Sequence, residues 1–269
     1  MAFPNRSRIL PLSGHRVRRI GARGPRGRRT MTQALTPPAD FQSRCADLGL
    51  DLAPTAITQL GQYLHQLLET NRKFNLTAIR DPTDAWHRHI LESLTLLPHL
   101  ADAKHVIDIG SGGGAPGLPL AIARPDIHIT LVEATGKKAR FLTDTAAALD
   151  LPNTTVLADR AETLAQASDH REQHDVALAR AVGPMRVLLE LTLPFVRVGG
   201  RLLALKGETI ESELRDAGDA LMILGAGDIG FHDALPDSDD PAVIVQVAKD
   251  RPTPPEFPRR PGIPKQDPL

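Results

Sequence analysis

The amino-acid sequence predicts an α/β protein: a doubly wound, mostly parallel sheet of seven strands, with a layer of helices before it. Two observations support this fold class. Apolar, β-branched runs recur between residues 105 and 248, and segments with helical periodicity separate most of them. Before residue 105 the apolar residues follow helical spacing alone. Strands that alternate with helices of this length are typical of βαβ units, in which helices cover both faces of a parallel sheet.

The N-terminal helical layer is assigned to residues 36–100. Between residues 54 and 71, Leu60, Leu64 and Leu67 recur at helical spacing, so one stripe of this helix should face a core. Two further helices are expected, a weaker one near 40–48 and one that begins at Pro82.

Residues 101–250 are assigned to the α/β domain. A polar turn from Asp237 to Asp240 separates the last two strands, which suits a hairpin with an antiparallel final strand. A doubly wound sheet that ends in such a hairpin is typical of methyltransferases rather than of dehydrogenases. The expected strands are 105–109, 128–132, 154–158, 175–179, 201–205, 226–232 and 242–248. The expected helices are 117–124, 137–149, 160–167, 184–196 and 208–224.

The two ends of the chain differ in composition from the part between them. Residues 1–30 contain nine arginines and no acidic residue, so residues 1–35 are expected to be a disordered extension. We interpret it as a segment upstream of a true start at Met31, with a transit peptide or a nucleic-acid-binding arm as alternatives. Residues 251–269 are rich in proline and arginine, and an extended basic tail is expected there.

Composition excludes several classes of protein. Cys45 is the single cysteine, which excludes a disulfide framework and a cysteine-based zinc site. His87 and His89 lie two residues apart on an expected helix and should face different ways, so no metal site is expected. The apolar runs are shorter than the roughly 20 residues that span a bilayer, and a cytoplasmic protein is expected.

The strongest motif is a glycine-rich turn after the first strand, from Gly110 to Gly117. Ligands of open α/β sheets bind outside the carboxyl ends of the strands, so a cofactor should meet this turn. Glycines such as Gly110 and Gly112 let the backbone approach a ligand closely. The spacing alone would also suit a dinucleotide-binding site, which makes it weak evidence by itself.

Two carboxylates favour S-adenosylmethionine over a dinucleotide. Asp108 stands two residues before the first glycine, where an anion suits a cationic amino-acid ligand better than a pyrophosphate. Glu133 ends the second strand, where it can accept hydrogen bonds from ribose hydroxyls. The alternatives are a carboxylate that caps the turn for Asp108 and a solvated strand end for Glu133.

Several motifs in order along the chain carry a family resemblance. They are Asn75-Leu76-Thr77-Ala78-Ile79, the segments 88–94 and 136–142, the glycine-rich turn, Arg160-Ala161-Glu162, Ala179-Arg180-Ala181, Leu205-Lys206-Gly207 and the tail 258–264. Over roughly residues 60–269 the sequence resembles the bacterial small-subunit ribosomal RNA (guanine-N7) methyltransferases, also called glucose-inhibited division protein B. The resemblance implies a class I, Rossmann-like methyltransferase that moves a methyl group from S-adenosylmethionine to N7 of the guanine at position 527 of 16S rRNA.

The resemblance also implies site residues. Gly110, Ala115, the pair Ala161-Glu162 and Arg180 would contact the cofactor. Arg180 would stand beside the methyl group and could orient the guanine through its O6, although a salt bridge to Asp175 or Glu162 is an alternative. Ala115 replaces a bulky apolar residue of the family pattern, and Glu92 replaces an aspartate.

The expected partner is 16S rRNA or the small ribosomal subunit, bound by a monomeric enzyme. Guanine N7 carries a lone pair, so the reaction needs alignment rather than a general base. The target base should lie in a loop or be flipped out of a helix. Lys137 and Lys138 are expected to contact phosphate, as are Arg259 and Arg260 in the tail, whereas Arg140 is expected to be structural.

Three other functions remain open from the sequence. A nicotinamide oxidoreductase would need a catalytic Tyr-x-x-x-Lys motif or a pair of a histidine and an acid near the cofactor. Tyr63, the single tyrosine, belongs to the N-terminal helices. A methyltransferase for a small molecule would need an apolar, closed substrate cap. A noncatalytic regulator of division would not need a working cofactor site.

Overall fold

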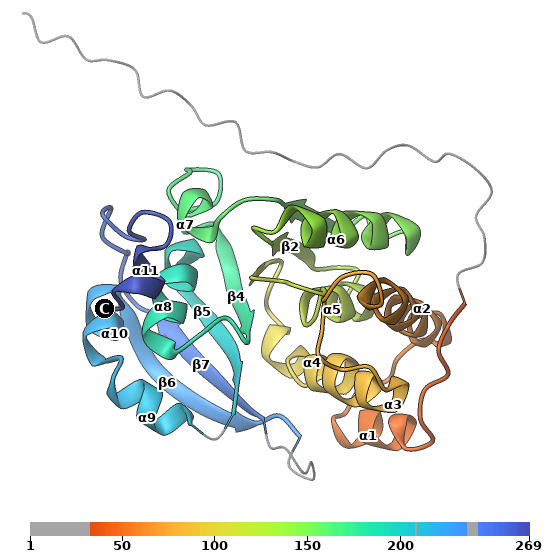
Figure 1. The fold of residues 1–269 in the computed structure, drawn as a ribbon. Coiled ribbons are helices and arrows are strands. Elements are labelled where there is room, and N and C mark those ends of the chain that lie inside the picture. The colour runs from red at the N-terminus through yellow and green to blue at the C-terminus, as the bar shows by residue number, and fades with distance from the viewer. Residues whose placement is uncertain (1–32, 208, 236–241) are drawn as a thin grey trace, which may run out of the picture.

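The computed structural model describes residues 33–207, 209–235 and 242–269 (Figure 1). The expectations for residues 1–32, including the start at Met31, lie outside this part of the chain, and so does the turn from Asp237 to Asp240. In the described ranges, no helix combines the length and the apolar character that crossing a membrane requires.

One sheet of seven strands organises the molecule, in the order β3-β2-β1-β4-β5-β7-β6. Its parallel part pairs β1 with β2 and β4, β2 with β3, and β4 with β5. The last two strands form the expected hairpin, since β7 runs antiparallel to both β5 and β6. The strands are β1 (His105–Ile109), β2 (His128–Val132), β3 (Thr154–Leu157), β4 (His174–Arg180), β5 (Val196–Lys206), β6 (Ala226–Asp233) and β7 (Val243–Lys249).

Helices cover both faces of the sheet, as the alternation along the strands requires. In β1, Val106 belongs to one hydrophobic core, whereas its neighbour Ile107 belongs to the other. The first core lies under α5 (Gly117–Ala123), α6 (Gly136–Ala148) and the N-terminal helices. The second lies under α7 (Ala161–Leu164), α8 (Met185–Thr192), α9 (Ile210–Arg215) and α10 (Gly218–Ile223) (Figure 1).

The N-terminal layer consists of α1 (Phe41–Asp47), α2 (Pro54–Asn71) and an interrupted helix that starts at Pro82. The Asp81 side chain caps that start by accepting the N–H groups of Thr83 and Asp84 at 2.8 and 3.1 Å. The interrupted helix continues from α3 (Pro82–Ala85) through the π-helical turn η1 (Trp86–Leu91) into α4 (Glu92–Leu94), and η2 (Leu97–Leu100) follows. Leu60 and Trp86 belong to the same core as Val106, and α2 and α4 contact α5, so this layer extends the core on that side of the sheet.

Three expected helices are shorter than their sequence pattern indicates. The expected helix 160–167 is reduced to α7, a single turn. The expected helix 184–196 ends at Thr192, because Pro194 lacks a backbone N–H, and a short 3-10 turn η3 (Leu193–Phe195) leads into β5. The expected helix 208–224 is split into α9 and α10, and α10 starts at Gly218, a poor helix former.

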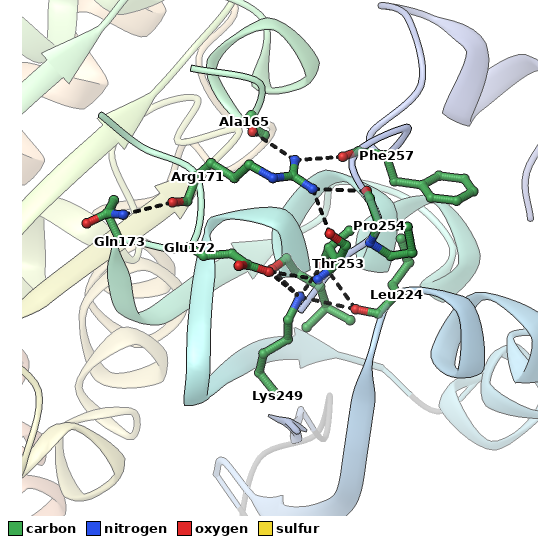
Figure 2. Close-up of polar contacts among 10 residues, drawn as sticks. Ala165, Arg171, Glu172, Gln173, Leu224, Lys249, Thr253, Pro254 and Phe257 are labelled. Atoms are coloured by element: carbon green, nitrogen blue, oxygen red, sulfur yellow. Dashed lines mark hydrogen bonds and ion pairs between the residues drawn. The ribbon is translucent and has the colours of Figure 1, made fainter. Parts of the chain in front are cut away.

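The C-terminal tail is bound to the second face by polar contacts that are buried or partly buried (Figure 2). The Arg171 guanidinium donates to the carbonyl groups of Thr253, Pro254 and Phe257 at 2.8, 2.9 and 2.7 Å. Lys249 is fully buried and donates to the Leu193 and Leu224 carbonyls and to Thr253. The tail contains the short helix α11 (Ile263–Gln266), and turns and bends precede it. The extended path expected for residues 251–269 stays a prediction.

Candidate cofactor and substrate site

The glycine-rich turn forms the floor of the site because its backbone takes conformations that side chains disfavour. Gly110, Gly112 and Gly114 have φ angles of 72°, 55° and 105°. A Cβ on Gly117 would lie 2.3 Å from Leu131 Cδ2, so only glycine lets the start of α5 pack this closely on β2. The turn therefore presents bare backbone at the carboxyl end of β1.

The Asp108 side chain is hydrogen-bonded to the end of this turn. It is fully buried, and Oδ2 accepts the Gly117 N–H at 3.1 Å. Oδ1 is buried and meets no hydrogen-bond donor among the described residues. Burial raises the pKa of Asp108 to about 7, although the Gly117 N–H and the charge of Arg180 both favour the carboxylate. Asp108 does not line the cavity, and its predicted contact with a cofactor stays a prediction.

Glu133 joins the end of β2 to the same turn. Its Oε2 accepts the Gly112 N–H at 3.0 Å, and its Oε1 accepts the Thr135 N–H at 2.6 Å. The side chain is 7% exposed, which differs from the alternative of a solvated strand end. The position is compatible with a ribose contact, which stays a prediction.

Arg180, at the end of β4, is held by the interrupted N-terminal helix. Its Nη1 donates to the Arg88 carbonyl at 2.6 Å and to Glu92 Oε2 at 3.0 Å. Its partner is therefore neither of the two acids named from the sequence. Asp175 instead pairs with Arg197 at 2.8 Å. Nε–H and one Nη2–H of Arg180 have no partner among the described residues, so they are available to an acceptor.

His89 completes this network, and the hydrogen bonds fix its tautomer. Arg180 Nη2 lies 2.9 Å from Nδ1, and because arginine only donates, Nδ1 must be the acceptor. The ring proton is then on Nε2, which lies 3.0 Å from the Thr77 hydroxyl. Burial, with Arg180 and Arg88 nearby, lowers the pKa of His89 to about 3. The ring therefore stays neutral at physiological pH.

The glycine-rich turn, His89 and Arg180 line one cavity of about 620 Å³ at the carboxyl ends of β1, β4 and β5, whereas Asp108 and Glu133 lie outside its lining. Parallel strands bring these ends to one edge of the sheet, as the sequence predicts for a ligand site. The cavity is lined by five residues named from the sequence, which are Gly110, Gly112, Ala115, Lys138 and Arg180. It is also lined by Tyr63, Thr77, His89 and Glu92, to which sequence reasoning gave no cofactor or substrate role. For Thr77, His89 and Glu92 the motifs 75–79 and 88–94 were the available signal, whereas Tyr63 lies in neither motif.

Other predicted site residues lie outside this cavity. Glu162 Oε1 accepts the Gly262 N–H of the tail at 2.9 Å, while Ala161 begins α7. The Arg259 guanidinium binds the fully buried Glu190 through Nε at 2.9 Å and Nη2 at 2.7 Å. Lys137 and Arg260 are exposed. The cofactor and RNA contacts predicted for these residues stay predictions, and Arg259 has a structural partner already.

No group of three or more metal-ligating side chains occurs in the part of the chain that the structure describes. His87 and His89 indeed face different ways: His87 lies 3.4 Å from Asp40, whereas His89 faces the cavity. The groups that this site presents to a ligand are the glycine-rich backbone, carboxylates and the anchored guanidinium of Arg180.

The strand order, the antiparallel β7 and the glycine-rich turn after β1 define a class I S-adenosylmethionine-dependent methyltransferase fold. Solved structures agree on the fold. A putative O-methyltransferase from Klebsiella pneumoniae matches with a TM-score of 0.54 and 15% identity, over 79% of this chain and 97% of that chain. An O-methyltransferase from Bacillus cereus in complex with SAH matches with a TM-score of 0.52 and 17% identity, over 77% and 96%.

Sequence comparison identifies the particular family. The GidB family, described as rRNA small subunit methyltransferase G, matches residues 56–234. A ribosomal RNA small subunit methyltransferase G from Sorangium cellulosum is 51% identical over 68% of this chain and 77% of its own length. One from Leuconostoc citreum is 42% identical over 85% and 98%. The chain belongs to the rRNA small subunit methyltransferase G family.

Proposed function

We propose that this protein transfers a methyl group from S-adenosylmethionine to N7 of the guanine at position 527 of 16S rRNA. The observation that carries the proposal is one cavity that joins the glycine-rich turn to an anchored arginine, in a chain of this family. The turn offers backbone to a cofactor, and Arg180 offers N–H donors to a base. A methyl donor and an acceptor base can therefore bind in the same cavity.

The residues present fit S-adenosylmethionine. A volume of about 620 Å³ is typical of small-molecule sites. The bare backbone of Gly110 and Gly112 allows close approach. The buried carboxyl of Asp108, with Oδ1 unpartnered among the described residues, places negative potential under a cationic ligand. Glu133 and the pair Ala161-Glu162 would contact the ribose and the adenine.

The chain's part in the reaction is alignment. When bound, S-adenosylmethionine supplies a methyl group that its sulfonium activates. Guanine offers two acceptors, N7 and O6. Donors of Arg180 that bind O6 would fix the base and leave the N7 lone pair free. Because Glu92 and the Arg88 carbonyl hold the guanidinium, its direction is set before the base arrives.

The site contains a histidine that cannot act as a base at neutral pH. With a pKa of about 3 and Nδ1 occupied by Arg180, His89 has no accessible lone pair. This agrees with a reaction in which no proton leaves before N7 attacks. His89 instead connects Arg180 to Thr77, and so positions the guanidinium.

We place the enzyme in the cytoplasm as a monomer that acts on 16S rRNA or on the small subunit. Among the described residues, only Val198, Met222 and Phe231 are large exposed hydrophobic side chains. Lys137, Lys138 and Arg260 are the cations that we assign to phosphate contacts. Sedimentation of the purified protein tests whether it is a monomer.

The function is tested by incubating the protein with labelled S-adenosylmethionine and 16S rRNA that lacks the modification. We expect label in the rRNA, and we expect Arg180→Ala to lower kcat strongly with a small change in cofactor affinity. Label that enters only small molecules, or no label at all, would contradict the proposal.

A further inference from the structure

A second cavity lies beside the first, between α2 and α6. Its volume is about 380 Å³, and its lining includes Gln66, Glu69, Phe74, Lys137, Arg140 and Asp144. The same two helices border the first cavity, through Leu67 of α2 and Lys138 of α6. Each of these residues is the immediate chain neighbour of a residue in the second cavity. The two cavities are therefore lined by neighbouring residues of the same two helices.

The side chains of the second cavity can make each kind of contact that a nucleotide requires. Phe74 is half-buried and offers part of its ring for stacking. Lys137 and Arg140 are exposed cations at the start of α6, and no ion pair joins them to a described residue. The structural role expected for Arg140 therefore has no ion-pair partner among the described residues. The Nε2 of Gln66 is buried and donates to no described acceptor.

The carboxylates of Glu69 and Asp144 make a simple anion an unsuitable ligand for this cavity. Glu69 binds Arg72 at 3.0 Å, and Asp144 lies on α6 four residues after Arg140. Carboxylates repel a bare phosphate or another simple anion, but they accept hydrogen bonds from the amino groups of bases. Cations, carboxylates, an amide and an aromatic ring together suit a whole nucleotide.

We propose that this cavity binds a nucleotide of the rRNA that neighbours the target guanine, with its base on Phe74 and Gln66 and its phosphate on Lys137 and Arg140. The proposal rests on the proposed function. A flipped base leaves its neighbours unstacked, and an aromatic ring beside the site would replace the lost stacking. The cavity would then keep the target base extruded, besides adding affinity.

The experiment compares Phe74→Leu, which removes the ring, with Phe74→Trp, which keeps one. Phe231→Leu is the control, because Phe231 is 51% exposed on β6 and lines neither cavity. The ligand is 16S rRNA without the modification, as free RNA and in small subunits. Removing a base stack lowers affinity by roughly tenfold, so Phe74→Leu should raise the Kd for RNA by that factor.

Affinity for S-adenosylmethionine, measured by calorimetry, should be unchanged in Phe74→Leu, and Phe74→Trp should keep RNA binding. Because Phe74 also packs against the first hydrophobic core, RNA binding is measured well below the melting temperature of each variant. Gln66→Leu is a second, independent variant and should weaken RNA binding by a smaller factor. An RNA hairpin with 2-aminopurine beside the target should lose fluorescence on the wild type but not on Phe74→Leu.

Unchanged RNA affinity in both Phe74→Leu and Gln66→Leu would overturn the proposal. Equal weakening by Phe74→Leu and Phe74→Trp would also overturn it, because only packing would then be affected. These failures differ from failure of the proposed function. If only the nucleotide cavity is wrong, the wild type still methylates 16S rRNA. If the proposed function is wrong, the wild type itself leaves the rRNA unlabelled.

Discussion

The buried carboxyl of Asp108 should make the protein less stable as the pH rises. Its pKa is raised from 3.8 to about 7, mainly by burial. A group whose pKa is higher in the folded state contributes stability that is complete below pH 3.8 and is lost as the pH rises through about 7. Since one pKa unit equals about 1.36 kcal/mol, the total loss is about 4 kcal/mol. Most of this loss, about 3 kcal/mol, falls between pH 5 and pH 8.

The measurement is urea unfolding of the ligand-free protein from pH 5 to pH 8, with Asp108→Asn as the comparison. Asparagine keeps an acceptor for the Gly117 N–H but does not ionise. The difference between the two free energies of unfolding should therefore change by about 3 kcal/mol across this range, in favour of the variant at high pH. If both proteins gave parallel pH profiles, the buried carboxyl would not titrate in this window, and the reasoning would be refuted.

Three further changes test other parts of the structure. Glu92→Gln should cost about 1–2 kcal/mol of stability and lower kcat, because a neutral amide holds Arg180 less firmly than a carboxylate does; denaturation and steady-state kinetics measure both. His174, whose buried ring nitrogens meet no described partner, has a pKa lowered to about 4, so stability is lost as the pH falls from 6.5. His174→Leu should remove about 3 kcal/mol of that loss in acid unfolding, and an unchanged acid profile would contradict this. Replacing Lys137 and Lys138 with alanine should flatten the plot of log RNA affinity against log salt by about one to two, whereas an unchanged slope would show a solvated face.

Most of the sheet could be predicted from the sequence because its strands are buried on both sides. Strands with two covered faces are continuous apolar runs, such as Val106 to Ile109, which are visible without any partner. The turn from Gly110 was equally visible, since the glycines reflect local backbone geometry. The closing hairpin followed from the short spacing between its strands.

The partners of the site residues could not be predicted in the same way. Arg180 and Glu92 are 88 residues apart, and Glu162 and Gly262 are 100 apart. Local periodicity contains no information about such pairs, because they depend on how the helices cross the sheet edge. For the same reason the sequence could not show that Arg259 reaches the buried Glu190.

The π-helical turn η1 is another feature that the sequence pattern did not show. The apolar stripe after Pro82 has ordinary helical spacing, yet the turn from Trp86 to Leu91 is wider than an α-helical one. This turn contains Arg88 and His89, the residues that hold Arg180. Such insertions are frequent at functional sites, and they follow from tertiary contacts rather than from propensity.

The most direct measurement is to map the methyl group on the RNA. Full-length 16S rRNA from cells that lack the modification is incubated with the protein and S-adenosylmethionine, then cleaved chemically at N7-methylguanine and read by primer extension. We predict one new cleavage, at the guanine at position 527, which disappears when the Arg180→Ala variant replaces the wild type. A methyl group on another nucleotide, on another atom of this guanine, or on no rRNA nucleotide at all would contradict the proposed function.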